Sequence, residues 1–253
     1  MKKALITGAS GGIGLEIARQ LAAQQYQITM VARNENKLRE AVKSLPGTGH
    51  LFLAADLTNE QDLQMVAGRL ATYKYDVLVN NAGAGIYGRF TDIKLDDHLA
   101  NMHLNMDALV RLSYSFLQHA TAGDALVNVG SMLAHSSLPG GSVYAATKSF
   151  VANFSESLWY EYKRKGIFVM GFNPGAADSE FHAHAGRTAG DFPEFVVSKV
   201  ADVAQELVQA LENRQQPRVM QGWKNRLMMF GFRFLSRKSA VNIMGQISPG
   251  MRS

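Results

Sequence analysis

The start of the chain joins an apolar run, a glycine-rich turn and an amphipathic run, and few folds accommodate this order. Residues 4–6 are apolar, Thr7 to Gly14 contains four glycines, and residues 15–23 have the residue spacing of a helix. A strand that enters a helix through a tight turn directs backbone N–H groups and the positive helix end at a phosphate. The segment therefore predicts the first unit of a parallel α/β sheet, with an anion site at the turn.

Three glycines of this turn have separate expected roles. Gly8 would form the tight turn, Gly12 would let the backbone approach a pyrophosphate, and Gly14 would let helix and strand pack closely. The spacing is G-x-x-x-G-x-G, which departs from the common dinucleotide fingerprint G-x-G-x-x-G. No Gly-Lys-Ser or Gly-Lys-Thr follows, so the turn is not a P-loop.

Strand and helix patterns alternate along the rest of the chain. The predicted strands are 3–7, 27–32, 49–54, 76–80, 124–130, 167–172 and 217–220. The predicted helices are 12–24, 35–44, 59–72, 95–119, 142–164 and 197–213. Such alternation is typical of a parallel sheet with helices on both faces. The 253 residues are 47% hydrophobic, 19% charged and free of cysteine, which indicates one large globular domain without disulfides.

Ser131, Tyr144 and Lys148 form a second pattern with chemical meaning. Tyr144 and Lys148 are four residues apart, so on a helix their side chains share a face. A cation beside a phenol favours the phenolate and lowers its pKa toward the range of general acid–base catalysis. Ser131 would hydrogen-bond the same substrate oxygen. By itself the Tyr-x-x-x-Lys spacing also fits a solvated helix face, and the surrounding motifs favour the catalytic interpretation.

With both patterns in place, the chain resembles the short-chain dehydrogenase/reductase family, from about residue 3 to about residue 180. The resemblance implies a Rossmann-type, doubly wound, mainly seven-stranded parallel sheet in a single α/β domain. It further implies a catalytic tetrad made of Asn105, Ser131, Tyr144 and Lys148. The domain would occupy residues 1–213, with a substrate lid near 176–197 and a basic extension, 214–253, packed on it.

The resemblance also assigns the residues that surround a nicotinamide cofactor, in the family's order along the chain. They are Gly8, Ser10, Gly12, Ile13, Gly14, Arg33, Asp56, Leu57, Asn81, Ala82, Gly83, Tyr144, Lys148, Pro174, Gly175 and Ser179. Within this set, Asp56-Leu57 would hold the adenine. Ser179 replaces the threonine usual in the family near the carboxamide.

The end of the second strand predicts which cofactor binds. An acidic side chain there would bond the ribose 2′-OH and select NAD, but Ala32 precedes Arg33 and no carboxylate is present. The guanidinium of Arg33 suits a 2′-phosphate. The sequence therefore predicts NADP(H), although Arg33 alone also fits a surface arginine.

The resemblance implies hydride transfer between nicotinamide and a carbonyl or alcohol carbon. Tyr144 would exchange the hydroxyl proton and Ser131 would hold the oxygen. Lys148 would lower the tyrosine pKa and bond the nicotinamide ribose, while Asn105 would support a proton path through helix backbone that it disrupts. The alternative is a non-catalytic NADP(H)-binding sensor or scaffold, which the intact tetrad disfavours.

The expected substrate wall is apolar. Leu133, Leu138 and Phe181 are the predicted contacts, and a small or lipophilic carbonyl or alcohol suits them better than a sugar. His182 and His184 alternate in the lid, but they lack a third ligand at metal spacing, so no metal is expected.

The C-terminal region is strongly basic. From Asn213 onward there are eight Lys/Arg and no Asp or Glu, which leaves the preceding body near −3 of the formal net +5. Residues 223–238 predict an amphipathic helix with the apolar stripe Trp223, Leu227, Phe230 and Phe234 bordered by cations. One interpretation is a cover for the cleft or a subunit interface; another is contact with an anionic membrane.

The expected partners are a small-molecule substrate and further copies of the chain. The family resemblance implies a dimer or tetramer through the helices near 95–119 and 142–164. Nucleic-acid binding is not expected, because no recognised motif accompanies the basic tail. The expected location is the cytoplasm, with peripheral contact to the inner face of a membrane as a variant.

Overall fold

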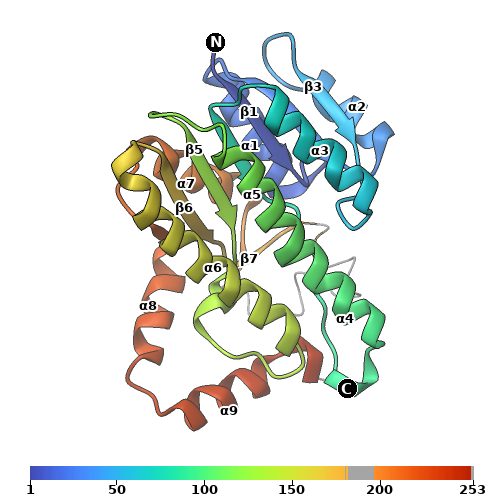
Figure 1. The fold of residues 1–253 in the computed structure, drawn as a ribbon. Helices are drawn as coiled ribbons and strands as arrows, with labels where there is room; N and C mark the ends of the chain where they lie inside the picture. The colour runs from blue at the N-terminus through green and yellow to red at the C-terminus, as the bar shows by residue number, and fades with distance from the viewer. Residues whose placement is uncertain (180, 182–196, 252–253) are drawn as a thin grey trace.

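The computed structural model describes residues 1–179, 181 and 197–251, and its centre is a seven-stranded sheet (Figure 1). All pairs are parallel, in the order β3-β2-β1-β4-β5-β6-β9. The strands are β1 (Lys3–Thr7), β2 (Gln27–Ala32), β3 (Leu51–Ala54), β4 (Val77–Asn80), β5 (Ala125–Val129), β6 (Phe168–Asn173) and β9 (Arg218–Met220). A separate small sheet pairs β7 (Ala176–Ala177) with β8 (Val197–Ser198). The predicted doubly wound parallel fold is confirmed.

Helices cover both faces of the large sheet. They are α1 (Gly12–Ala23), α2 (Glu35–Lys43), α3 (Glu60–Thr72), α4 (Leu95–Met102), α5 (Leu109–Leu117), α6 (Ser142–Tyr162), α7 (Val200–Asn213), α8 (Trp223–Phe232) and α9 (Arg237–Ile247). Short 3₁₀ turns lie at Phe90–Asp92, Met132–His135, Lys163–Lys165 and Pro249–Met251.

Alternation along the strands divides the core into two layers. Ile6 of β1 packs with α1, α2 and α7 on one face of the sheet. Its neighbour Leu5 packs with α3 and α5 on the other face, where Leu158 and Tyr162 of α6 also contribute. Successive strand side chains point to opposite faces, and both faces here are apolar because both are covered by helices.

The predicted helix over 95–119 is interrupted. A π-helical turn, His103–Ala108, separates α4 from α5 and contains Asn105. Such bulges are frequent at functional sites. The expectation that Asn105 lies in locally disrupted helix backbone is confirmed.

The tail prediction of one helix over 223–238 is wrong. α8 ends at Phe232, and α9 begins at Arg237 after the N-cap Ser236, whose hydroxyl accepts a hydrogen bond from Ser239 N at 3.1 Å. A serine in this position satisfies a backbone donor of a new helix and so favours a start there. β9 belongs to the large sheet, and the chain leaves the sheet for the tail only after it.

Candidate active site

A cavity of about 750 Å³ opens where β1, β2, β4, β5 and β6 end at the same edge of the sheet. Parallel α/β sheets bind ligands at this edge. Every residue predicted to surround the cofactor lines the cavity, from the glycine turn through Arg33, Asp56 and Asn81 to Ser179. Ser131, Tyr144 and Lys148 line it too, so both sequence patterns meet in one site.

The glycine turn presents an uncapped helix start to this cavity. Gly11, the N-cap of α1, is extended, and no side chain hydrogen-bonds to the cap. The first turn of α1 has no acidic residue. The first N–H groups of a helix have no partner within the helix, so they form a site for an anion. Gly8 and Gly12 have φ of 64° and 55°, which glycine adopts without strain.

Asn81 fastens the end of β4 to the end of β1. Its Nδ2 donates to the carbonyl oxygens of Thr7, at 2.9 Å, and Gly8, at 3.1 Å. The hydroxyl of Thr7 accepts hydrogen bonds from the backbone N–H groups of Asn81 and Ala82. These bonds fix the backbone that leads to Gly83, where an added Cβ would lie 3.4 Å from Lys148 Nζ.

Asn105 does not line the cavity, and it acts instead on the segment that does. Its Oδ1 accepts from Ala84 N and its Nδ2 donates to Ala84 O, both at 3.0 Å. The same Nδ2 lies 3.1 Å from Thr147 Oγ1 of α6. The π-helical turn thereby joins the loop after β4 to the helix that contains Tyr144 and Lys148.

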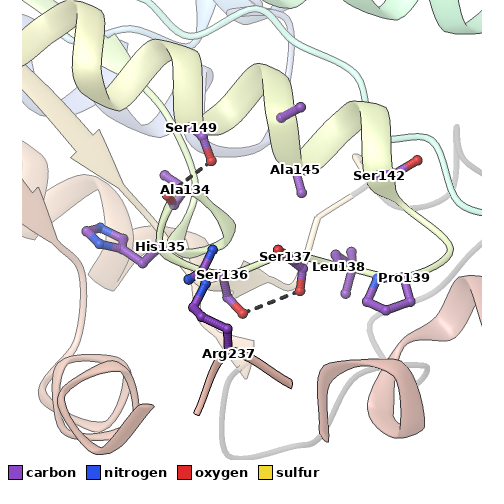
Figure 2. Close-up of a pocket in the computed structure, with 11 residues that line it drawn as sticks. Ala134, His135, Ser136, Ser137, Leu138, Pro139, Ser142, Ala145, Ser149 and Arg237 are labelled. Carbon is purple, nitrogen blue, oxygen red and sulfur yellow. Dashed lines mark hydrogen bonds between the residues drawn. The ribbon is translucent and has the colours of Figure 1, made fainter. Parts of the chain in front are cut away.

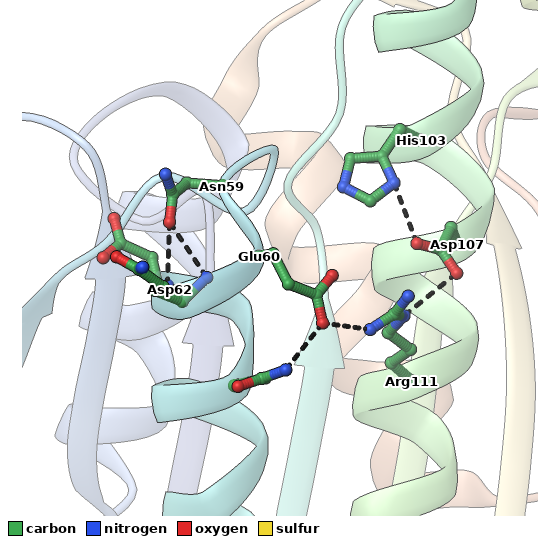
Figure 3. A network of polar contacts seen from close by, with 8 residues as sticks. Asn59, Glu60, Asp62, His103, Asp107 and Arg111 are labelled. Atoms are coloured by element: carbon green, nitrogen blue, oxygen red, sulfur yellow. Dashed lines mark hydrogen bonds and ion pairs between the residues drawn. The ribbon is translucent and has the colours of Figure 1, made fainter.

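A surface network supports this turn (Figure 3). Asp107 accepts from Arg111 at 3.1 Å and lies 2.8 Å from His103, and Arg111 reaches Glu60 of α3 at 2.7 Å. Hydrogen bonds from Gln64 and Arg111 lower the pKa of Glu60, while those to Asp107 and Glu60 raise the pKa of Arg111. All four groups are at least partly exposed, so the network contributes little stability.

Tyr144 and Lys148 are both 5% exposed. Lys148 Nζ donates to the carbonyl oxygen of Val129 at 3.1 Å and lies 5.9 Å from the centroid of the Tyr144 ring. Ser131 Oγ accepts from Leu133 N at 3.2 Å, which leaves its O–H to donate elsewhere. The helical spacing and the end of β5 thus bring these three side chains into one site.

The pKa values of the pair differ from the expectation. Burial raises the pKa of Tyr144 to about 12, and the hydrogen bond with Ser131 opposes this only in part. Burial lowers the pKa of Lys148 to about 8. The expected depression of the tyrosine pKa by Lys148 is wrong for this structure, because desolvation of the phenol dominates. Near neutral pH the phenol therefore retains its proton, which suits a general acid.

The predicted substrate residues divide between two cavities. Leu133 and Phe181 line the main site, and the Phe181 ring lies 6.2 Å from that of Tyr144. Leu138 is not among the described residues that line it, so its contact with substrate stays a prediction that this cavity does not support. Leu138 packs on Ala145 and Met244 and faces a second cavity of about 470 Å³ beside α6. Figure 2 shows Arg237, at the start of α9, reaching into that second cavity.

Sequence reasoning missed Tyr87 and Lys37, which both line the main cavity. The ring of Tyr87 contacts Tyr144 edge-on at 5.8 Å, and burial, with a smaller effect of Tyr144, raises the Tyr87 pKa well above its ordinary value. An aromatic residue between Gly85 and Gly88, just after the predicted cofactor residues Asn81, Ala82 and Gly83, is a signal in the sequence that could have identified Tyr87. Lys37, in the first turn of α2, follows Arg33 by four residues and adds a second cation at this end of the cavity.

Most of the expected lid near 176–197, including His182 and His184, lies outside the described residues. Within the described residues, no cluster of three or more His, Cys, Asp and Glu has the arrangement of a metal site. In that same part of the chain, no helix has both the length and the apolar content of a membrane span.

Comparison with known proteins agrees with the geometry. The family model described as short chain dehydrogenase matches residues 2–189. Sulfoacetaldehyde reductase 2 of Chromohalobacter salexigens is 32% identical over 194 residues, or 74% of this chain and 76% of that protein. An uncharacterized oxidoreductase of Bacillus subtilis is 30% identical over 72% of this chain, which spans only 53% of that relative. A solved short-chain dehydrogenase from Sphingobium yanoikuyae in complex with NADPH is 30% identical, with a TM-score of 0.83 over 92% of this chain and 94% of its own.

Proposed function

The chain belongs to the short-chain dehydrogenase family, and we propose that it is an oxidoreductase that moves a hydride between NADP(H) and a carbonyl or alcohol carbon. One observation carries the proposal: Tyr144 and Lys148 lie in the cavity that also contains the uncapped start of α1. A proton-transfer group and a phosphate site in one cavity are what a nicotinamide-dependent reductase needs. The Sphingobium relative, in complex with NADPH, supports the choice of cofactor.

The residues present fit NADP(H). The N–H groups at the start of α1 would hold the diphosphate, and Arg33, with Lys37 four residues later, would meet a 2′-phosphate. Ala32 provides no carboxylate to repel that phosphate or to select NAD. Lys148 would bond the nicotinamide ribose. When bound, NADP(H) supplies the hydride.

The chain's own residues handle the oxygen and its proton. Ser131 donates its O–H to the substrate oxygen, since its Oγ already accepts from Leu133 N. Tyr144, held as the neutral phenol by burial, donates its proton to the oxygen as negative charge develops there. The Lys148 ammonium then stabilises the phenolate. Asn105 holds the segment at Ala84 against α6. We propose that it also supports the path by which the proton of Tyr144 is replaced.

The proposed substrate is a small or lipophilic carbonyl compound or alcohol. Tyr87, Met132, Leu133 and Phe181 give the cavity wall beside Tyr144 an apolar and aromatic character. A screen of NADPH oxidation against ketones, aldehydes and quinones tests the activity. Turnover with at least one of these classes is expected. Tight NADPH binding without turnover in any of them would instead support a cofactor-binding scaffold.

Replacing Arg33 tests the cofactor assignment. We expect Arg33→Glu to lower the ratio of NADPH to NADH efficiency by about 10- to 100-fold, because a charge-assisted bond to the 2′-phosphate is lost. Lys43→Glu makes the same charge change at the far end of α2 and should leave the ratio unaltered. An unchanged ratio in Arg33→Glu would contradict the assignment to NADP(H).

We also propose that the chain forms a homo-oligomer through α4, α5 and α6. Leu95, Leu99 and Met102 recur at helical spacing on α4 and are 65%, 51% and 39% exposed. Tyr114 of α5 is exposed as well. A contiguous exposed apolar face of this kind is typical of an interaction surface. Light scattering gives the mass, and a strictly monomeric protein would contradict this proposal.

A further inference from the structure

Helix α8 has two apolar faces, and only one of them packs against the rest of the protein. Met229 and Asn225 are buried, and Phe232 packs against the cluster of Leu138, Ala145 and Met244. This inner face is fastened by Arg226, whose guanidinium donates to Glu206 of α7 at 2.7 Å. The helix therefore has a fixed orientation on the body, and its other face points outward.

The outer face is apolar and aromatic. Trp223, Leu227 and Phe230 follow one another on α8 at intervals of four and three residues, and Phe234 lies in the turn just after the helix. These side chains are 64%, 62%, 55% and 77% exposed, in that order. The rings of Phe230 and Phe234 contact each other edge-on at 5.2 Å. Four adjacent large apolar side chains of this exposure mark an interaction surface rather than scattered surface residues. We call these four residues the α8 stripe.

The seven cations of the tail that lie within the described residues differ in what they contact. Arg214 donates to the Gly123 carbonyl, Arg218 pairs with Glu156, and Arg226 pairs with Glu206. These three arginines therefore attach the tail to the rest of the domain. Arg237 reaches into the second cavity (Figure 2). Lys224 lies on α8, Arg233 is the C-cap of α8, and Lys238 lies in the first turn of α9. Among the described residues no ion pair joins these three to a carboxylate.

We propose that the α8 stripe, together with Lys224, Arg233 and Lys238, docks on an anionic lipid surface. The indole and phenyl rings would enter the boundary between headgroups and acyl chains, and the cations would meet lipid phosphates. A second copy of this face fits less well, because a two-fold contact would bring the same cations together without a carboxylate from the tail. The cytoplasmic leaflet carries anionic lipid and suits the expected cytoplasmic location.

Docking would also bring the catalytic cavity close to the membrane. Tyr87 and Leu133, which line that cavity, pack against the same cluster of Leu138, Ala145 and Met244 as Phe232 of α8 does. In Figure 1, α8 and α9 run along one side and the base of the molecule, away from the N-terminus. If the proposed reductase function holds, lipophilic substrates dissolved in the membrane would lie near the site. The docking proposal itself does not depend on catalysis.

Flotation of the full-length protein tests the proposal. Vesicles of phosphatidylcholine alone are compared with vesicles of equal parts phosphatidylcholine and phosphatidylglycerol, at low and high salt. Wild-type protein should float with the anionic vesicles at low salt and not with the neutral ones. Absence of binding at low salt would overturn the proposal.

Two variants and a matched control identify the surface. W223S/F230S/F234S and K224Q/R233Q/K238Q should each lower the vesicle partition coefficient by roughly tenfold or more. The control K163Q/R164Q/K165Q removes three cations next to one another outside the tail and should bind like wild type. Circular dichroism and NADPH affinity show that each variant is folded. An equal loss in the control would overturn the proposal, because it would mean that net charge alone drives binding.

Two further experimental outcomes would identify a different partner for the α8 stripe. If W223S/F230S/F234S binds vesicles normally but has a smaller mass by light scattering, the stripe is a subunit interface and the proposal is wrong. If wild-type protein binds duplex DNA, as fluorescence anisotropy would show, and does not bind anionic vesicles, the partner is a nucleic acid and the proposal is equally wrong.

Discussion

The glycine turn and helix α8 pack against the same domain in opposite ways. At Gly14 there is no space for a single added carbon, because a Cβ would meet Gly8 O, Asn81 Nδ2 and Ala9 Cα. α8 touches the body through Met229 and Asn225 and leaves Leu227 and Trp223 in solvent. At Gly14 the protein's own atoms fill the space around the glycine turn. Only the inner face of α8 packs on the protein, so its outer face is available to a partner.

The largest effect in this comparison is expected at Gly14. Gly14→Ala should lower the free energy of unfolding by about 3 kcal/mol, because the new methyl group would press on the backbone of Gly8 and Ala9, which cannot move aside. Chemical denaturation measures the change. Gly11→Ala is the matched control: an added Cβ there has no neighbour within 4 Å, so its stability should stay close to wild type. Equal stability of the two variants would contradict this account of the turn.

A smaller effect is expected when the two faces of α8 are compared. Met229→Ala should cost about 2 kcal/mol of stability, since a buried side chain is removed. Leu227→Ala, two residues away and 62% exposed, should change stability by less than about 0.5 kcal/mol. Thermal and chemical denaturation give both values. A large cost at Leu227 would mean that the outer face packs on the protein, which removes the contrast between the regions.

The smallest expected effect concerns pH. Lys148 has a pKa of about 8 in the folded protein, lowered by burial, so it loses its charge as pH rises through 8. We expect kcat/KM for reduction to be level below pH 8 and to fall above it, because the cation that supports the phenolate is lost. Tyr144, with a pKa raised to about 12, stays protonated throughout this range.

Lys148→Arg provides the control for this profile, because a guanidinium keeps its charge. Its absolute rate will differ, but the decline above pH 8 should disappear. A decline of the same shape in Lys148→Arg would assign the decline to another titrating group.

The lowered pKa of Lys148 also predicts that stability rises with pH. The folded pKa lies below the ordinary 10.5, so the cost of burying the charge is relieved between about pH 8 and 10.5.

The sequence predicted the features that depend on a repeating pattern or on residues close together in the chain. Strand and helix alternation gave the doubly wound sheet, because period and turn chemistry are written in consecutive residues. The turn at Gly8, Gly12 and Gly14, the Tyr144–Lys148 pair and Arg33 were placed by motif, and the structure brings them into one cavity.

Quantities that depend on distant packing could not be predicted in this way. The pKa of Tyr144 depends on how thoroughly the folded chain excludes water, which no local spacing reveals. Leu138 was expected on the wall of the site, yet it packs against Met244, more than a hundred residues later, and lines the second cavity. The break between α8 and α9 rests on Ser236, a capping signal inside a run that otherwise continues the helical pattern.

The central claim is that Tyr144 transfers the proton while the glycine turn and Arg33 hold NADP(H). The direct measurement is NADPH oxidation by wild type and Tyr144→Phe on a carbonyl compound that wild type reduces, with NADPH affinity determined for both. The account predicts that Tyr144→Phe binds NADPH normally and loses about 10²- to 10⁴-fold in kcat, since only the acidic proton is removed. Near-wild-type turnover by Tyr144→Phe would contradict it.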